Sequence, residues 1–99
     1  MLTGKQKRFL RSKAHHLQAI FQVGKDGVNE NMLEQLDDVL EKRELIKVKV
    51  LQNCLEDKAS VAEQLQEGTG AELVQIIGNQ IILYRPASEE PKIILPSES

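Results

Sequence analysis

The stretch Ala19-Ile20-Phe21-Gln22-Val23-Gly24-Lys25-Asp26-Gly27 decides the fold, because it joins a strand pattern to a G-x-x-G turn. A helical pattern of apolar residues follows directly, from residue 29 to residue 43. A turn built on two glycines lets bare backbone approach a ligand, and the N-terminus of the next helix presents unpaired N–H groups and a partial positive charge. Both features favour a phosphate group, and in RNA-binding modules a loop of this kind clamps the nucleic-acid backbone.

Positive charge is concentrated in the same part of the chain. The 99 residues have a net charge of −2. Residues 1–25 contain six Lys and Arg residues and no Asp or Glu, whereas residues 26–99 contain seven Lys and Arg residues and all fifteen acidic residues. This asymmetry predicts one side that faces a polyanion and another, acidic side that faces water.

The composition argues against several other classes of protein. Cys54 is the only cysteine, so no intramolecular disulfide can form, which fits a reducing cytoplasm. No apolar run approaches the roughly 20 residues needed to cross a membrane. His15 and His16 are adjacent, and neighbouring helical residues point about 100° apart, so they are poorly placed to share a metal ion. Because a nucleophile–base pair and a nucleotide fingerprint are also missing, the sequence predicts no enzyme, no cofactor and no metal site.

The first predicted helix carries the positive charge on one side. Residues 3–17 have helical spacing, with Thr3 as the N-cap and with Phe9, Leu10 and Leu17 on the buried side. The basic stripe consists of Lys7, Arg8, Arg11 and His15. Solvated helix faces usually mix both signs of charge, so a purely positive stripe favours contact with a polyanion.

The rest of the chain alternates between strands and helices. Strands are predicted at residues 18–23, 45–51, 72–77 and 80–85, and further helices at residues 29–43 and 57–67. Asn29 is suited to cap the second helix, and Gly68 is predicted to end the third. Gly78-Asn79 is a two-residue hairpin connection. In the second strand, Lys47 and Lys49 project from the same face.

The order α-β-α-β-α-β-β predicts an α/β fold. Two helical connections imply parallel pairing between some of the strands, and the last hairpin adds an antiparallel pair. We therefore expect a single compact domain with a mixed four-stranded sheet packed with three helices. This domain is expected to span residues 1–86, and residues 87–99 are expected to form a flexible C-terminal tail. Within the tail, Ile93-Ile94-Leu95 either docks on the domain or stays exposed.

A series of short motifs resembles a known family. The motifs are Leu2-Thr3-Gly4-Lys5-Gln6-Lys7, Ala14-His15, Val23-Gly24-Lys25-Asp26-Gly27-Val28, Glu44-Leu45-Ile46-Lys47-Val48, Thr69-Gly70-Ala71, Ile77-Gly78 and Leu83-Tyr84-Arg85. In this order and at these spacings they resemble the chloroplast RNA splicing and ribosome maturation (CRM) domain, and most closely its stand-alone bacterial form, the YhbY-like proteins. The resemblance covers residues 2–86.

The resemblance implies a compact domain akin to the C-terminal domain of translation initiation factor three. It implies RNA binding through the glycine loop and adjoining basic surfaces. For bacterial members it implies association with precursors of the large ribosomal subunit and a role in ribosome assembly. The expected partners are therefore rRNA and, in pre-ribosomal particles, ribosomal proteins or assembly factors, and the protein is expected to be a cytoplasmic monomer.

Asp26 departs from the neutral or basic residues that are common in this loop. Four alternatives are open for its side chain: it points away from the RNA, it orients Lys25, it caps a local N–H group, or it weakens the phosphate contact.

The expected RNA contacts fall into two groups. The first group is Gly24, Lys25, Asp26, Gly27, Lys5, Lys7, Arg8, Arg11, Lys13 and His15. The second group is Lys47, Lys49 and Arg85, for which a solvated lysine or an arginine that ends a strand is an equally good interpretation. Tyr84 is expected in the core, with base stacking as the alternative. A protein-interaction adaptor, acting through the acidic helix 29–43 or through residues 93–95, is the alternative function.

Overall fold

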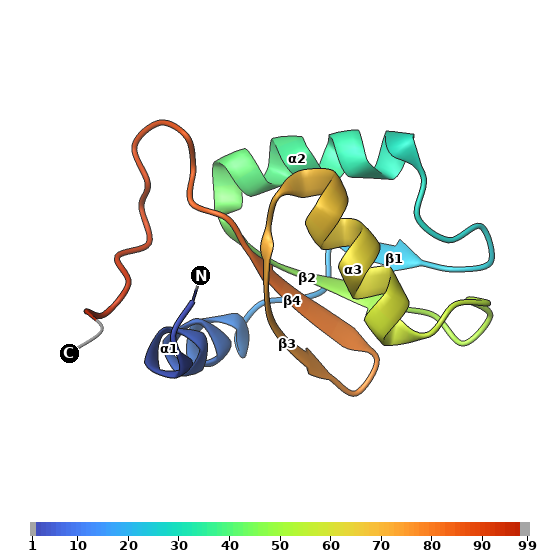
Figure 1. The fold of residues 1–99 in the computed structure, drawn as a ribbon, viewed down its shortest axis with the longest axis horizontal. Helices are drawn as coiled ribbons and strands as arrows, with labels where there is room; N and C mark the ends of the chain where they lie inside the picture. The colour runs from blue at the N-terminus through green and yellow to red at the C-terminus, as the bar shows by residue number, and fades with distance from the viewer. Residues whose placement is uncertain (1, 98–99) are drawn as a thin grey trace.

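The computed structural model describes residues 2–97 and has its helices and strands in the predicted order (Figure 1). The elements are α1 (Gly4–Ala14), β1 (Phe21–Val23), α2 (Glu30–Arg43), β2 (Leu45–Val50), α3 (Lys58–Thr69), β3 (Glu72–Ile77) and β4 (Gln80–Tyr84). The strand order in the sheet is β1-β2-β4-β3. β1 runs parallel to β2, whereas β2 and β3 are both antiparallel to β4, so the mixed four-stranded sheet is confirmed.

α1 and α2 begin at the predicted capping residues, and α3 begins after Asp57, which was predicted only as the start of that helix. The Oγ1 atom of Thr3 accepts a hydrogen bond from the backbone N–H of Gln6 at 3.1 Å, and the Oε1 atom of Gln6 accepts one from the N–H of Thr3 at 3.1 Å. The side chains of Asn29 and Asp57 cap α2 and α3 by accepting from the N–H three residues further on, at 2.9 and 2.7 Å. Each cap satisfies a backbone donor that the first turn of a helix leaves unpaired, which is why these local signals are readable in the sequence.

The prediction that Gly68 ends the third helix is wrong. α3 continues to Thr69, and Gly70 forms the C-cap in the left-handed conformation, with φ of +74°. Gly68 lies inside the helix. A Cβ atom at this position would come within 2.5 Å of the Cδ2 atom of Leu33, which explains why the position is a glycine. The missing side chain thus allows α3 to approach α2.

Two other predicted boundaries were too generous. α1 ends at Ala14 rather than residue 17, and β1 begins at Phe21 rather than residue 18. The N–H of Leu17 donates to the carbonyl oxygen of Ala14 in a turn, after which the chain crosses to the edge of the sheet. β1 therefore pairs with β2 over three residues, Phe21 to Val23.

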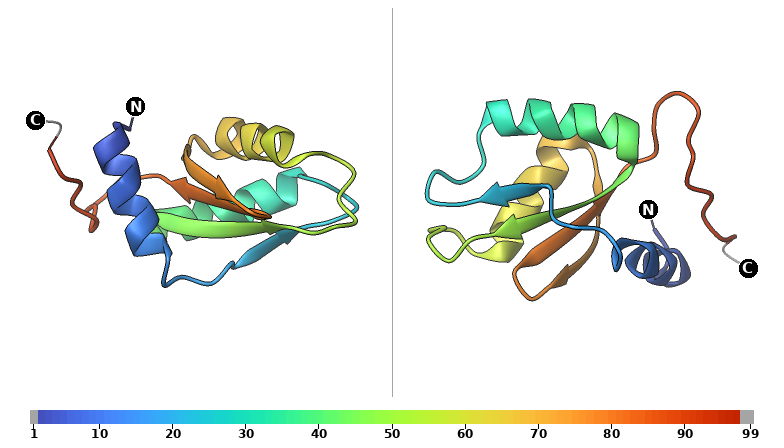
Figure 2. Two further views of the ribbon diagram at one scale, coloured as in Figure 1. Left: turned by 90° about the horizontal axis from the view of Figure 1, so that it is seen from below. Right: turned by 180° about the vertical axis from the view of Figure 1, so that it is seen from behind.

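The two faces of the sheet pack against different helices (Figure 2). β2 shows the division, because Ile46, Val48 and Val50 enter the larger core with α2 and α3. Leu45 points to the opposite face and packs with Leu10 of α1 in a second core. The second core also holds Tyr84, which confirms the expectation that this tyrosine is buried. No described helix is long and apolar enough to cross a membrane.

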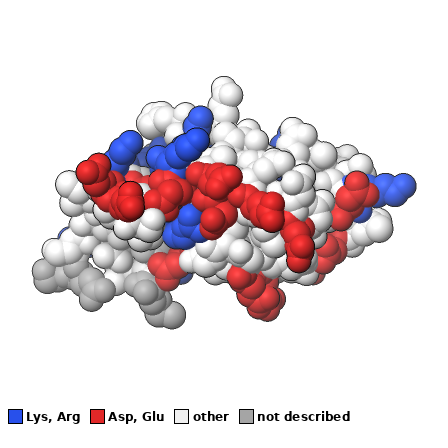
Figure 3. Space-filling model, turned by 90° about the horizontal axis from the view of Figure 1, so that it is seen from above, with Lys and Arg blue, Asp and Glu red and all other residues white. Residues whose placement is uncertain are grey.

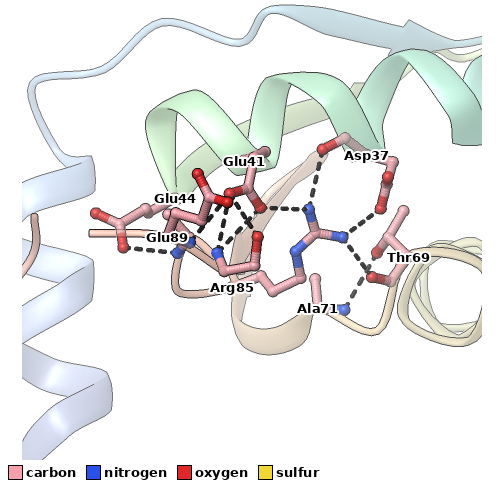
Figure 4. A network of polar contacts seen from close by, with 9 residues as sticks. Asp37, Glu41, Glu44, Thr69, Ala71, Arg85 and Glu89 are labelled. Carbon is pink, nitrogen blue, oxygen red and sulfur yellow. Dashed lines mark hydrogen bonds and ion pairs between the residues drawn. The ribbon is translucent and has the colours of Figure 1, made fainter. Parts of the chain in front are cut away.

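The carboxylate of Glu44 holds the segment that follows β4 (Figure 4). Glu44 is 1% exposed. Its Oε2 atom accepts from the N–H of Ala87 at 2.9 Å, and its Oε1 atom accepts from the N–H groups of Lys92 at 2.8 Å and Ile93 at 2.9 Å. These bonds tie an extended segment without helix or strand to the end of α2.

The same segment contacts α1. Ile93 and Leu95 pack against the second core, and the Nε2 atom of Gln6 donates to the carbonyl oxygen of Pro96 at 3.1 Å. Ile94 is 84% exposed. The three residues Ile93-Ile94-Leu95 therefore divide, with Ile93 and Leu95 docked and Ile94 in solvent. Its flexibility stays a prediction, and residues 98–99 lie outside the described residues.

The environment of Glu44 sets the sign of its effect on stability. Burial raises the pKa of this carboxyl group, but the N–H groups of Ala87, Ile93 and Lys92, together with the charge of Lys92, outweigh burial and hold the pKa below its usual value of 4.5. A carboxyl group with a lowered pKa stabilises the folded state above the unfolded-state pKa, and this contribution is lost as the pH falls through the folded-state pKa.

Glu44→Gln should lower the free energy of unfolding at pH 7 by about 1–3 kcal/mol, because an amide NH₂ group cannot accept the buried N–H bonds. The difference from the wild type should shrink as the pH falls below about 4.5. Denaturant unfolding between pH 3 and pH 7 measures both effects. Glu89→Gln is the control, since Glu89 is exposed and should change stability by less than about 0.5 kcal/mol. A difference for Glu44→Gln that does not depend on pH would contradict this account.

Candidate nucleic-acid interface

The helix α1 covers only part of its face of the sheet. It packs against β2, β3 and β4 at one end of the sheet, as both views in Figure 2 show. Beyond it, Lys47, Lys49 and Gln80 stay half-buried, and Gln22 and Ile77 are exposed. Because α2 and α3 cover the opposite face, this uncovered half-face is the part of the sheet that a ligand can reach directly.

A groove of about 520 Å³ lies between α1 and this half-face. We call it the basic groove, and it is lined by Arg8, Arg11, Ser12, His15, His16, Lys47, Ile77, Gln80 and Ile82. Its walls come from α1, from the turn that follows α1, and from three strands. No acidic side chain lines it, so the groove combines cations with neutral polar and apolar groups, as a polyanion site requires.

Helical geometry places the basic stripe beside the groove. Leu10 and Ala14 are fully buried and fix the inner side of α1. Arg8, Arg11 and His15 line the groove from the adjacent side. Arg11 is held in place by its Nη1 atom, which donates to the Oε1 atom of Gln75 on β3 at 2.9 Å. Three residues of the predicted stripe, Arg8, Arg11 and His15, therefore face the open half of the sheet.

The other candidates on α1 lie elsewhere. Lys7 and Lys5 are exposed but do not line the basic groove. Lys13 is on the far flank of the helix, with its Nζ atom 5.5 Å from the centre of the Phe9 ring. There it lines a second hollow with Arg43 and Ile93. Lys13 was expected among the RNA contacts although it is not part of the basic stripe, and the structure places it on the other side of the helix.

Lys47 and Lys49 connect the two ends of the half-face. The Nζ atom of Lys47 donates to the carbonyl oxygen of Leu17 at 2.9 Å, which anchors it beneath the turn after α1. Lys49 is paired with Gln22 on β1, two residues before Gly24. Residues two apart on a strand point the same way and are about 7 Å apart. The two lysines thus continue the positive charge from the basic groove toward the glycine loop. The sequence places them on one face of their strand, but their position relative to the loop depends on the pairing of β2 with β1.

The glycine loop is a closed turn. The N–H of Gly27 donates to the carbonyl oxygen of Gly24 at 3.0 Å, and Gly27 has φ of +68°. Among the described residues, the N–H groups of Lys25 and Asp26 have no acceptor. Two unpaired donors beside the exposed Lys25 side chain are suited to a phosphate oxygen.

The space left by the two glycines is occupied by the neighbouring loop. A Cβ atom on Gly24 would lie 3.2 Å from the Oδ1 atom of Asn53, and one on Gly27 would lie 2.9 Å from the Oε2 atom of Glu56. The positive φ of Gly27 favours glycine there, and a side chain at either position would press on the neighbouring loop. The carboxylates of Asp26 and Glu56 also oppose the charge of Lys25, so the cationic charge of the interface is concentrated in the basic groove.

Arg85 is engaged within the protein. Its Nη1 atom donates to the carbonyl oxygen of Thr69 at 2.8 Å and pairs with the carboxylate of Asp37, and its Nη2 atom donates to the carbonyl oxygen of Asp37 at 3.0 Å (Figure 4). A contact of 3.8 Å joins Nη2 to Glu41. The side chain is 19% exposed and links β4 to α2 and α3. This geometry favours the structural interpretation of Arg85 that the sequence left open.

The two histidines lie against each other. The rings of His15 and His16 are 5.5 Å apart, edge to face, and both line the basic groove. Within residues 2–97, no group of three or more His, Cys, Asp or Glu side chains is arranged to hold a metal ion. The arrangement offers positive or neutral hydrogen-bond donors rather than a ligand set.

Comparison with known proteins places these features in a family. The model of the CRS1 / YhbY (CRM) domain matches residues 2–85. A Bacillus subtilis protein named "Probable RNA-binding protein YqeI" is 66% identical, over 97% of this chain and 100% of its own length. A Haemophilus influenzae protein named "RNA-binding protein" is 43% identical, over 96% of this chain and 95% of its own length. The solution structure of SAV1595 from Staphylococcus aureus has a TM-score of 0.81 at 60% identity and covers 97% of this chain and 100% of its own.

Arg85→Met and Lys49→Met each remove one positive charge, and they should have opposite effects. Arg85→Met should lower the free energy of unfolding by about 1–3 kcal/mol, because it leaves Asp37 and two carbonyl groups without their donor. It should leave the salt concentration for elution from heparin nearly unchanged. Lys49→Met should elute at lower salt and change stability by less than about 0.5 kcal/mol. The reverse pattern would return Arg85 to the interface.

Proposed function

The chain belongs to the CRS1 / YhbY (CRM) domain family, and from this premise we propose that it is an RNA-binding protein that holds the phosphate backbone in the basic groove. The observation that carries the proposal is the convergence of Arg8 and Arg11 of α1 with Lys47 of β2 in one groove. Lys47 is far from Arg8 and Arg11 in the sequence, and the fold brings the three residues to one uncovered surface. Relatives that carry RNA binding in their names support RNA as the polyanion.

RNA bound in this way runs from α1 across the sheet to the glycine loop. Arg8, Arg11 and Lys47 neutralise phosphates in the groove, and Lys49 neutralises the next one along the strand. The free N–H groups at residues 25–26 then receive a further phosphate. Contacts to phosphate position the RNA and release counterions, so affinity falls with salt and depends little on sequence.

The proposed target is rRNA in precursors of the large ribosomal subunit, where the protein assists assembly as a cytoplasmic monomer without catalytic chemistry or a cofactor. This target rests on the resemblance to the YhbY-like proteins. The structure is compatible with it, since a groove that contacts phosphates suits folded rRNA with many local sequences.

The opposite side of the molecule has the opposite charge. Acidic side chains form a band over α2 (Figure 3). The exposed acidic residues of this helix are Glu30, Glu34, Asp37 and Asp38. In the RNA proposal, this band repels phosphate and restricts RNA to the basic groove. It also gives a specific reason to keep the adaptor alternative, because an acidic band suits a basic protein partner, and both surfaces are accessible at once.

The salt dependence of RNA binding tests the groove. Arg8→Glu/Arg11→Glu should weaken binding of a single-stranded RNA by tenfold or more at 100 mM salt. It should also reduce the slope of log K against log salt by about 1.4, which corresponds to two phosphate contacts on a single strand. Fluorescence anisotropy over a range of salt concentrations measures both quantities.

Lys42→Glu/Arg43→Glu is the matched control for the charge change, because both residues are exposed near the end of α2 and do not line the basic groove. It should change the affinity by less than about threefold. Equal losses of RNA affinity in the groove variant and the control would mean that net charge alone governs binding. An unchanged slope of log K against log salt for Arg8→Glu/Arg11→Glu would mean that α1 does not contact the RNA.

Sedimentation of ribosomal particles from cells tests the target. The wild-type protein should co-sediment with precursors of the large subunit, and Arg8→Glu/Arg11→Glu should remain at the top of the gradient. These residues are preferred to Gly24 and Gly27, whose replacement would displace Asn53 and Glu56 as well as any ligand. Co-sedimentation of a folded double variant would favour the alternative function as a protein-interaction adaptor. Absence of the wild-type protein from all particles would contradict rRNA of large-subunit precursors as the target.

A further inference from the structure

A second loop lies beside the glycine loop. β1 and β2 are parallel, so the residues that follow them leave the same edge of the sheet. Residues 51–57 follow β2, and a turn in which the N–H of Cys54 donates to the carbonyl oxygen of Leu51 at 3.0 Å closes this second loop. Its residues Asn53 and Glu56 occupy the space beside the two glycines.

The side chain between these contacts points into solvent. Leu55 is 86% exposed, more than any other large hydrophobic residue among those described. Asn53 is exposed as well, and its side-chain amide forms no hydrogen bond within residues 2–97. The second loop, which lies against Gly24 and Gly27, therefore offers an apolar group and an unused donor–acceptor pair.

We propose that this second loop contacts an unpaired nucleobase of the RNA, with Leu55 against the face of the base and Asn53 bonded to its edge. The proposal rests on the proposed function and names the class of RNA that this end of the interface selects. A base is attached to each phosphate through its sugar, so a phosphate at the N–H groups of Lys25 and Asp26 brings a base to the adjacent loop. In a single strand that base is free to turn away from its neighbours.

The local charge favours a base over a second phosphate. The carboxylates of Asp26 and Glu56 lie at this end of the interface, and the Oε1 atom of Glu56 is held by the Nε2 atom of Gln64 at 2.6 Å. A duplex would bring the phosphates of its second strand near these carboxylates, whereas a neutral base is not repelled. An amide such as that of Asn53 has both a donor and an acceptor for a base edge.

Aromatic residues do not provide a stacking surface here. Tyr84 is buried, and Phe9 and Phe21 pack against the two cores. The face of a base that turns out of the RNA therefore meets an aliphatic side chain. Leu51 contacts the position of Gly24 but is half-buried, so Leu55 is the exposed leucine of this second loop.

Substitutions of opposite sign at Leu55 test the inference. Leu55→Ser should weaken binding of a single-stranded 12-nucleotide RNA by threefold or more, and Leu55→Phe should strengthen it severalfold, because aromatic rings stack better on bases. Neither variant should change binding of a blunt duplex of the same sequence by more than about twofold. Ile94→Ser is the matched control, since Ile94 is 84% exposed at the other end of the molecule. Anisotropy titrations at one salt concentration, with thermal unfolding of each variant, provide the measurements.

The outcomes separate this inference from the proposed function. If Leu55→Ser and Leu55→Phe both bind single strands as the wild type does, while Arg8→Glu/Arg11→Glu loses binding, the inference is wrong and the function stands. Equal losses for Leu55→Ser and Ile94→Ser, or equal losses on duplex and single strand, also overturn it. If the groove variant keeps its RNA affinity, the proposed function itself fails.

Discussion

An eleven-residue helix covers only part of one sheet face, and the surface chemistry of the molecule depends on this incomplete coverage. The alternation in β2 sends Leu45 beneath α1 but leaves Lys47 and Lys49 beyond the covered region. On the opposite face, α2 and α3 complete a core, so the same strand can tolerate cations on one side only. The positive groove thus follows from the packing that stabilises the sheet, since the same alternation fills the core and exposes the lysines.

The buried carboxylate of Glu44 supplies hydrogen-bond acceptors to the segment that follows β4. The extended segment after β4 has no partner strand, and its N–H groups near α2 would otherwise be buried without acceptors. One ionised side chain accepts three of them and keeps Ile93 and Leu95 against α1. The position of α1, and with it one wall of the basic groove, is therefore coupled to residues at the far end of the chain.

The features predictable from the sequence were those encoded within a few residues. Thr3 and Asn29 signal helix starts through bonds to their near neighbours, and the alternation in β2 fixes its two faces. The end of the third helix was predicted wrongly at Gly68, because this glycine makes room for Leu33 on another helix and does not end its own. The role of Arg85 was likewise set by contacts across the fold, and the path of positive charge through Lys49 depends on strand register. Local spacing contains no information about any of these.

The hydrogen bonds of Glu44 also bear on the order in which the parts of the fold can form while the chain is being synthesised. When β4 has been made, every strand of the sheet is present, and both cores can begin to form. Glu44 nevertheless has none of its three carboxylate donors, because they belong to residues 87–93. Until those residues emerge from the ribosome, the folded sheet must either keep this carboxylate open to water or bury it unpaired. The last part of the domain to be made is therefore the part that allows its charged interior residue to be enclosed.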